Sequence, residues 1–203
     1  MHMIFKTLSA TVTAFSLVAT SQASAIFDTL SIPTSGQASN LGQSFKTGVL
    51  GSNSTLSNIV FKSAHDTRDG KENFKLTLRI YEDTSGDEND WNQGSLLASS
   101  KQQTIVGGSS TLYSFEFGSL KLKDNTVYLV EFDAASDSTI RVGFTGSNTD
   151  SRGAAFRNTT TTPSLLTDSD FAIQVNTAAT AAKAPLAALV SIGGITISLD
   201  SKR

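Results

Sequence analysis

The stretch that decides the fold alternates apolar and polar side chains over residues 74–81: Phe74-Lys75-Leu76-Thr77-Leu78-Arg79-Ile80-Tyr81. Successive side chains of a β-strand point to opposite faces of a sheet, so a strand here places Phe74, Leu76, Leu78 and Ile80 on one face. Lys75, Thr77, Arg79 and Tyr81 then occupy the other face. The pattern therefore predicts a strand with one face buried and one face in water.

The same alternation recurs along the chain and predicts several more strands. Four further runs place apolar residues at every second position: Tyr113, Phe115 and Phe117; Tyr128, Val130 and Phe132; Ile140, Val142 and Phe144; and Phe171, Ile173 and Val175. Weaker candidates cover residues 26–31, 42–47, 56–63 and 95–100. Turn signals such as Asp69-Gly70 and Gly107-Gly108 separate the runs.

The number and the spacing of these strands predict an all-β fold. No window of the body supports a helix of three turns. Short strands that are each wet on one face favour an antiparallel two-sheet β-sandwich of jelly-roll type. We expect most of the 12 phenylalanines to lie between the sheets. A closed barrel is the alternative, because periodicity alone does not distinguish the two.

Composition narrows the classes of function. The 203 residues include no cysteine, which excludes disulfides, thiolate metal sites and a cysteine nucleophile. The 16 basic and 18 acidic residues give a slightly negative chain without a basic cluster. Nucleic-acid binding calls for clustered lysine and arginine, so we expect no nucleic-acid partner.

The first 25 residues have the layout of a secretory signal peptide. Lys6 precedes an apolar stretch from Leu8 to Ala19, and Ala23 and Ala25 are the small residues that signal peptidase recognises. The stretch is shorter than the roughly 20 residues of a membrane-spanning helix. We expect cleavage after Ala25 and export to the cell surface or the extracellular space. A buried N-terminal helix is the alternative.

The C-terminal part has a different composition from the body. An Ala/Thr linker over residues 177–183 leads into an uncharged apolar segment, and Lys202-Arg203 ends the chain. This order predicts a sorting or anchoring tail over residues 184–203 with weak or transient membrane association. The alternative is a further strand, because Ile195, Ile197 and Leu199 alternate.

The body resembles the choice-of-anchor domains of bacterial exported proteins, most closely the type labelled R. The resemblance rests on five segments in the expected order: LGQSFKTG (41–48), LTLRIY (76–81), GSLLA (94–98), LKLKDNTVYLV (120–130) and DFAIQV (170–175). It implies a secreted β-sandwich over residues 26–176 that is tethered by an interchangeable C-terminal signal, and it supplies no catalytic residue. The tail resembles a reduced PEP-CTERM signal, with Lys183-Ala184-Pro185 in place of Pro-Glu-Pro and Lys202-Arg203 in place of several arginines.

An acidic segment follows the strand at 74–81. Asp83, Asp87 and Asp90 are spaced in the manner of a calcium loop, and carboxylates close in sequence can converge on one ion. The EF-hand pattern is incomplete, because Gly86 stands at the fourth position and Gly94 at the twelfth. The segment predicts a calcium site, or else a hairpin loop whose charge keeps it soluble.

Trp91, the single tryptophan, lies in the same segment. If the loop is exposed, we expect the Trp91 ring to stack against a sugar. The alternative is that the ring packs against the base of the loop.

A second polar cluster, His65, Asp66 and Asp69, suits a metal or acid–base site. The strand at 74–81 spans roughly 25 Å, so this cluster and the acidic segment lie at opposite ends of a sandwich. No Gly-x-Ser-x-Gly elbow occurs, and no pair of carboxylates stands out.

These features predict a non-catalytic module of the cell envelope or the extracellular matrix. Its expected partners are polysaccharide or envelope proteins, with no cofactor other than calcium. The alternative is a carbohydrate-active enzyme on a jelly-roll scaffold.

Overall fold

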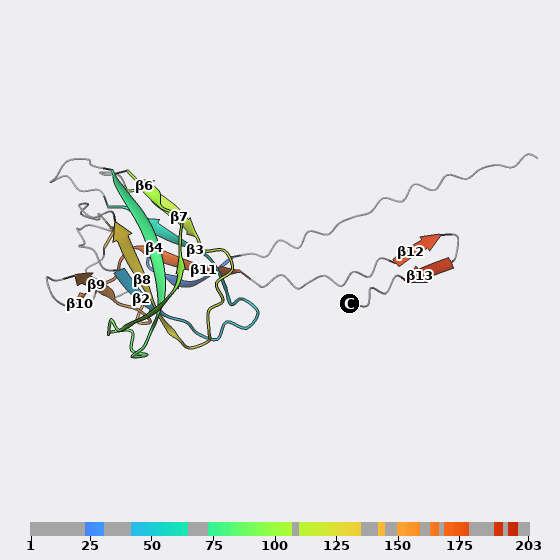
Figure 1. The fold of residues 1–203 in the computed structure, drawn as a ribbon, viewed down its shortest axis with the longest axis horizontal. Coiled ribbons are helices and arrows are strands. Elements are labelled where there is room, and N and C mark those ends of the chain that lie inside the picture. Colours follow the sequence, from blue (N-terminus) through green and yellow to red (C-terminus); the bar gives the residue numbers. More distant parts are fainter. Residues whose placement is uncertain are drawn as a thin grey trace, which may run out of the picture.

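Antiparallel β-strands make up the ordered body of the chain (Figure 1). The computed structural model describes residues 23–30, 42–64, 73–106, 110–134, 142–144, 150–158, 163–166, 169–178, 189–192 and 195–198. These residues contain no helix, and so none that is long and apolar enough to cross a membrane.

Two sheets contain eleven of the strands. The four-stranded sheet has the order β1 (Ser24–Asp28), β11 (Ile173–Ala178), β3 (Thr55–Lys62) and β7 (Leu112–Glu116). The seven-stranded sheet has the order β10 (Pro163–Leu166), β9 (Ala155–Asn158), β2 (Gly42–Lys46), β8 (Val127–Ala134), β4 (Phe74–Asp83) and β5 (Gln93–Ser99), and β6 (Gln103–Ile105) pairs with β4 beside β5. The expected antiparallel two-sheet β-sandwich is confirmed.

The strand order is that of a jelly roll. β1-β11-β3-β7 in one sheet and β2-β8-β4-β5 in the other place strands side by side that are far apart in the chain. β1 pairs with β11, and β2 pairs with β8. The β9–β10 hairpin extends the second sheet beyond β2. Both ends of the body therefore meet in the four-stranded sheet.

The core lies between the two sheets. Along β4 the predicted alternation holds: Phe74 is 4% exposed, and Leu76, Leu78 and Ile80 are fully buried. Eight phenylalanines belong to the core: Phe27, Phe45, Phe61, Phe74, Phe115, Phe117, Phe132 and Phe171. The ring of Phe132 lies 5.6 Å from that of Phe61 and 5.3 Å from that of Phe171, which links β8 to the opposite sheet.

The expectation that every strand has one wet face is wrong for the middle of the seven-stranded sheet. Ser44 of β2 and Leu129 of β8 are fully buried although they point away from the core. The alternation of apolar and polar residues along a strand identifies only the face of the strand that packs against the other sheet. A segment that folds over the outer face is a tertiary feature, and the next subsection describes it.

Some strands differ from the expected ones. β6, β9 and β10 were not predicted, because each has only three or four residues. In the expected strand at 140–144, Val142 and Phe144 form only isolated bridges, and Ile140 lies outside the described residues. β11 continues to Ala178, so the body extends past residue 176.

The two termini are partly described. Ala23 and Ala25 are exposed, and β1 begins at Ser24, so the predicted cleavage point lies inside this strand. Phe27 is the first buried residue of the strand. Residues 1–22, including the predicted signal helix, lie outside the described part. In the tail, β12 (Leu189–Ile192) pairs with β13 (Ile195–Ser198) as a separate two-stranded sheet, and the sorting role stays a prediction.

One glycine tests the packing of β2 against β8. A Cβ atom at Gly42 would lie 1.8 Å from the backbone oxygen of Val130, so we expect Gly42→Ala to lower the free energy of unfolding by about 1–3 kcal/mol. Gly48→Ala is the matched control, because nothing lies within 4 Å of its added Cβ. Urea denaturation measures both. Equal stability of the two variants would contradict the described pairing.

Candidate functional site

The acidic loop, defined as residues 84–92, connects β4 to β5 and is organised by Asp83. The Asp83 side chain is buried, and its Oδ1 accepts hydrogen bonds from the amides of Ser85 at 2.7 Å and Gly86 at 2.9 Å. Its Oδ2 accepts one from the amide of Asn92 at 2.8 Å. The Ser85 hydroxyl also donates to Oδ1. One carboxylate therefore ties the beginning of the loop to its end.

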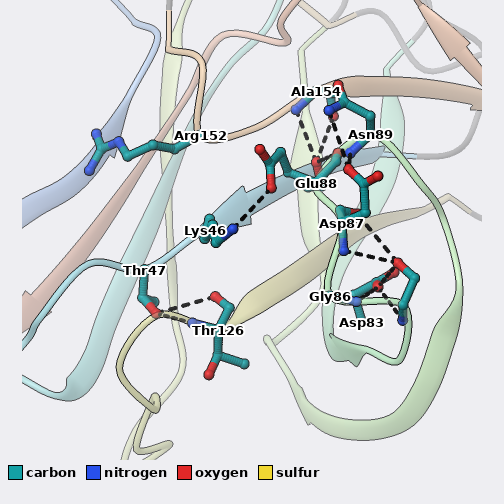
Figure 2. A network of polar contacts seen from close by, with 12 residues as sticks. Lys46, Thr47, Asp83, Gly86, Asp87, Glu88, Asn89, Thr126, Arg152 and Ala154 are labelled. Carbon is teal, nitrogen blue, oxygen red and sulfur yellow. Dashed lines mark hydrogen bonds and ion pairs between the residues drawn. The ribbon is translucent and has the colours of Figure 1, made fainter.

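The loop folds over the outer face of the seven-stranded sheet (Figure 2). The Ser44 hydroxyl donates to the backbone oxygen of Glu88 at 2.5 Å and accepts from the amide of Ala154 at 2.9 Å. The Glu88 carboxylate pairs with the Lys46 ammonium at 3.4 Å. These contacts explain why Ser44, and Leu129 beside it, are buried on this face.

Trp91 anchors the other side of the loop. Its ring lies 5.2 Å from that of Phe156 on β9, and Ala154 completes a small apolar cluster separate from the main core. Aromatic pairs of this kind contribute about 0.5–1.5 kcal/mol beyond the area that they bury. The Trp91 side chain is half-buried, so the loop is held at both flanks.

The exposed carboxylates of the loop accept hydrogen bonds from the loop itself. Asp87 Oδ1 accepts from the amide of Asn89 at 2.9 Å, and Asp90 Oδ1 accepts from the amide of Trp91 at 2.8 Å. No group of three acidic or histidine side chains suited to a metal ion occurs within the described ranges. Calcium binding at Asp83, Asp87 and Asp90 stays a prediction.

The other predicted sites have different outcomes. The structure places Trp91 against Phe156 rather than against the base of its own loop, and sugar contact at Trp91 stays a prediction. His65, Asp66 and Asp69 lie outside the described residues. The acidic segment is a loop between two strands, as expected, but its docking onto β2 was not predicted.

A group of charged side chains lies beyond the loop on the same face. The Arg79 guanidinium contacts Asp133 at 2.7 Å and Glu131 at 3.6 Å, and the Tyr81 hydroxyl donates to Glu131 at 2.9 Å. Burial raises the pKa of Tyr81, and the hydrogen bond to Glu131 raises it further. The Tyr81 hydroxyl therefore keeps its proton at neutral pH and donates a hydrogen bond to Glu131.

A shallow depression of about 390 Å³ lies at the base of the acidic loop and is lined in part by Glu82 and Asp83. Glu82 forms an ion pair with Lys123 at 2.7 Å. Asp83 accepts the loop amides described above. Both carboxylates thus already have partners.

The outer face of the four-stranded sheet carries a row of polar side chains from all four strands. We define this polar row as Asp28, Gln174, Asn176, Asn58, Ser114 and Glu116. Gln174 donates to Asp28 at 2.7 Å and accepts from Asn176 at 3.2 Å. Asn58 donates to the Ser114 hydroxyl at 2.7 Å, and Ser114 donates to Glu116 at 3.0 Å.

One atom of the polar row differs from the others in its hydrogen bonding. Asn58 Oδ1 is buried and has no hydrogen-bond partner within the described part of the chain. Sequence reasoning did not find the row, because each member occupies an ordinary outward position of its strand. Only the pairing of β1, β11, β3 and β7 brings the members together.

Comparison of the chain with protein-family models, curated proteins and solved structures found no match.

Substitution of Asp83 tests whether it organises the acidic loop. In Asp83→Asn an amide group replaces one acceptor oxygen and faces N–H donors, so we expect a loss of about 1–3 kcal/mol in the free energy of unfolding. We also expect the fluorescence emission of Trp91, the single tryptophan, to shift to longer wavelength as the loop loosens.

The control is Asp90→Asn, because Asp90 is exposed and accepts only from the adjacent amide of Trp91. It should leave both readouts unchanged. Wild-type emission and stability in Asp83→Asn would show that the carboxylate does not hold the loop.

Proposed function

We propose that this chain is an exported, non-catalytic β-sandwich module of the cell envelope or the extracellular matrix that contacts polysaccharide or surface proteins. The observation that supports the proposal is the polar row on the outer face of the four-stranded sheet. Its amide, hydroxyl and carboxylate groups are the groups that exchange hydrogen bonds with sugar hydroxyls. Hydrogen bonds within the row hold its six side chains in two groups of three, which lowers the entropy that binding would cost.

The two outer faces of the sandwich differ, which favours the four-stranded sheet as the contact face. The acidic loop, the Trp91–Phe156 pair and the ion pairs of Arg79 occupy much of the seven-stranded sheet. In the polar row Asp28, Ser114 and Glu116 are exposed and Gln174 and Asn58 are partly exposed, whereas Asn176 is buried. A long, flat partner such as a polysaccharide would find its hydrogen-bonding groups there.

The state of the carboxylates supports a binding role over catalysis. Retaining and inverting glycosidases hold two carboxyl groups on either side of the scissile bond, one of them ready to donate a proton. Glu131 and Asp133 share Arg79, and Glu82 pairs with Lys123. Each of these carboxylates therefore already has a cationic partner.

The proposal of export rests on the signal-like sequence of the first 25 residues, and cleavage there shortens β1 without removing it. Cleavage after Ala25 removes only exposed residues of this strand, whereas Phe27 and the Thr29 hydroxyl, which donates to Ile173 O at 2.9 Å, remain. The mature chain loses the pairs Ser24–Thr177 and Ala25–Asn176 and keeps the pairs Phe27–Val175 and Asp28–Gln174 of the four-stranded sheet.

Fractionation of producing cells tests the proposal. We expect the protein in the envelope or matrix fraction with an intact mass that begins at Ile26, and we expect it to sediment with matrix that has been stripped of protein by protease. It should release no reducing sugar from that matrix.

The control is a variant with a blocked cleavage site, Ala23→Leu with Ala25→Leu, which should stay with the cytoplasmic membrane at full length. Wild-type protein in the cytosol with Met1 intact would overturn export. Failure to bind matrix either before or after protease treatment would overturn the contact role, and release of reducing sugar would overturn the non-catalytic role.

A further inference from the structure

A groove of about 540 Å³ lies where the two sheets approach each other at β6 and β7. It is lined by Lys101, Gln102, Gln103, Ser114, Glu116 and Gly118. Figure 1 shows β6 and β7 side by side, β6 in the seven-stranded sheet and β7 at the edge of the four-stranded sheet. Ser114 and Glu116 are also the last members of the polar row, so the groove is the recessed end of that row.

Backbone hydrogen-bonding groups on the facing edges of β6 and β7 already have side-chain partners. Gln103 Nε2 donates to the backbone oxygen of Ser114, and the amide of Val106 donates to the Tyr113 hydroxyl at 2.9 Å. A peptide that adds to a sheet edge needs such backbone groups for its own hydrogen bonds. The groove therefore favours a ligand that bonds to side chains over an added strand.

The hydrogen bonds around Ser114 orient the wall of the groove. The Ser114 hydroxyl accepts from Asn58 Nδ2 and donates to Glu116 Oε1, so the hydroxyl fixes one oxygen of the carboxylate. The other carboxylate oxygen can accept a hydrogen bond from a ligand. Asn58 itself is partly exposed and its Oδ1 is buried without a partner in the described part of the chain.

The charges of the lining favour a neutral ligand. Lys101 and Glu116 carry opposite charges, and the remaining lining residues are two glutamines, a serine and a glycine. A polyanion would meet Glu116, and a polycation would meet Lys101, whereas hydroxyl groups act as both donors and acceptors toward amides. No aromatic ring belongs to this lining, so the hydroxyl groups rather than the face of a sugar would supply the contact.

We infer that the groove between β6 and β7 binds a short stretch of a neutral polysaccharide, with Gln102 and Glu116 as the hydrogen-bonding side chains. The inference rests on the proposed function and assigns the contact to one place and one chemical class. The acidic loop and Trp91 lie on the opposite face of the sandwich and take no part in this contact.

Affinity electrophoresis of the full mature protein tests the inference. The gels contain neutral polysaccharides (dextran, laminarin, xylan or mannan) or anionic ones (alginate or hyaluronan). We expect at least one neutral polymer to retard the protein and the anionic polymers to leave its mobility unchanged. A neutral hydrogen bond contributes about a factor of five to binding and a bond to a charged group about a factor of ten or more, so Gln102→Ala should weaken retardation about fivefold and Glu116→Gln about tenfold.

Two controls separate the groove from the rest of the molecule. Gln93→Ala removes an exposed glutamine at the start of β5, and Trp91→Phe changes the sugar-stacking candidate on the other face. Both should keep wild-type retardation. Thermal melts verify that all four variants are folded.

The outcomes distinguish failure of the inference from failure of the proposed function. Retardation by a neutral polymer that persists in both groove variants, or that is lost in Trp91→Phe, would overturn the groove and leave the binding module intact. Retardation by anionic polymers alone would overturn the neutral ligand class. If no polymer retards the protein but it still sediments with protein-containing matrix, the groove inference is wrong and the module contacts proteins.

Discussion

Burial of phenylalanine rings between the two sheets is the interaction on which the rest of this structure depends. The chain has no cysteine, so no disulfide assists the core. Phe132 of β8 packs against Phe61 of β3 and against Phe171, two residues before β11, and so joins the seven-stranded sheet to the four-stranded one. Because these rings hold the sheets face to face, the outer faces are free to differ.

The outer faces of the two sheets differ in what covers them. On the seven-stranded sheet a second layer forms, because Asp83 gathers the ends of the acidic loop and Ser44 bonds to Glu88. Many polar side chains on this face form hydrogen bonds or ion pairs with other residues of the chain. On the four-stranded sheet most side chains of the polar row keep contact with solvent, although Asn176 is buried, and the row ends in the groove between β6 and β7. The division gives the sandwich one face that stabilises the fold and one face that suits a partner.

Sequence reasoning reached the candidate site only in part. It correctly placed the acidic segment in a loop between two strands. It assigned Asp83 to a calcium site and Trp91 to sugar contact, and both roles stay predictions. It did not find the partners of the loop, Ser44 and Phe156, because these residues are distant in the chain and look like ordinary strand residues. The polar row was missed for the same reason: Asn58 and Ser114 become neighbours only through the pairing of β3 with β7.

The sequence by itself determined the longer strands and the side of each that packs against the other sheet. This information is local, since a period of two residues is legible within a single segment such as 74–81 and requires no knowledge of its neighbours. The order of the strands, the second buried face at Ser44 and Leu129, and the groove at β6 and β7 were decided only by the tertiary structure. Each of these features depends on contacts between segments far apart in the chain, and such contacts have no periodic signature in the sequence.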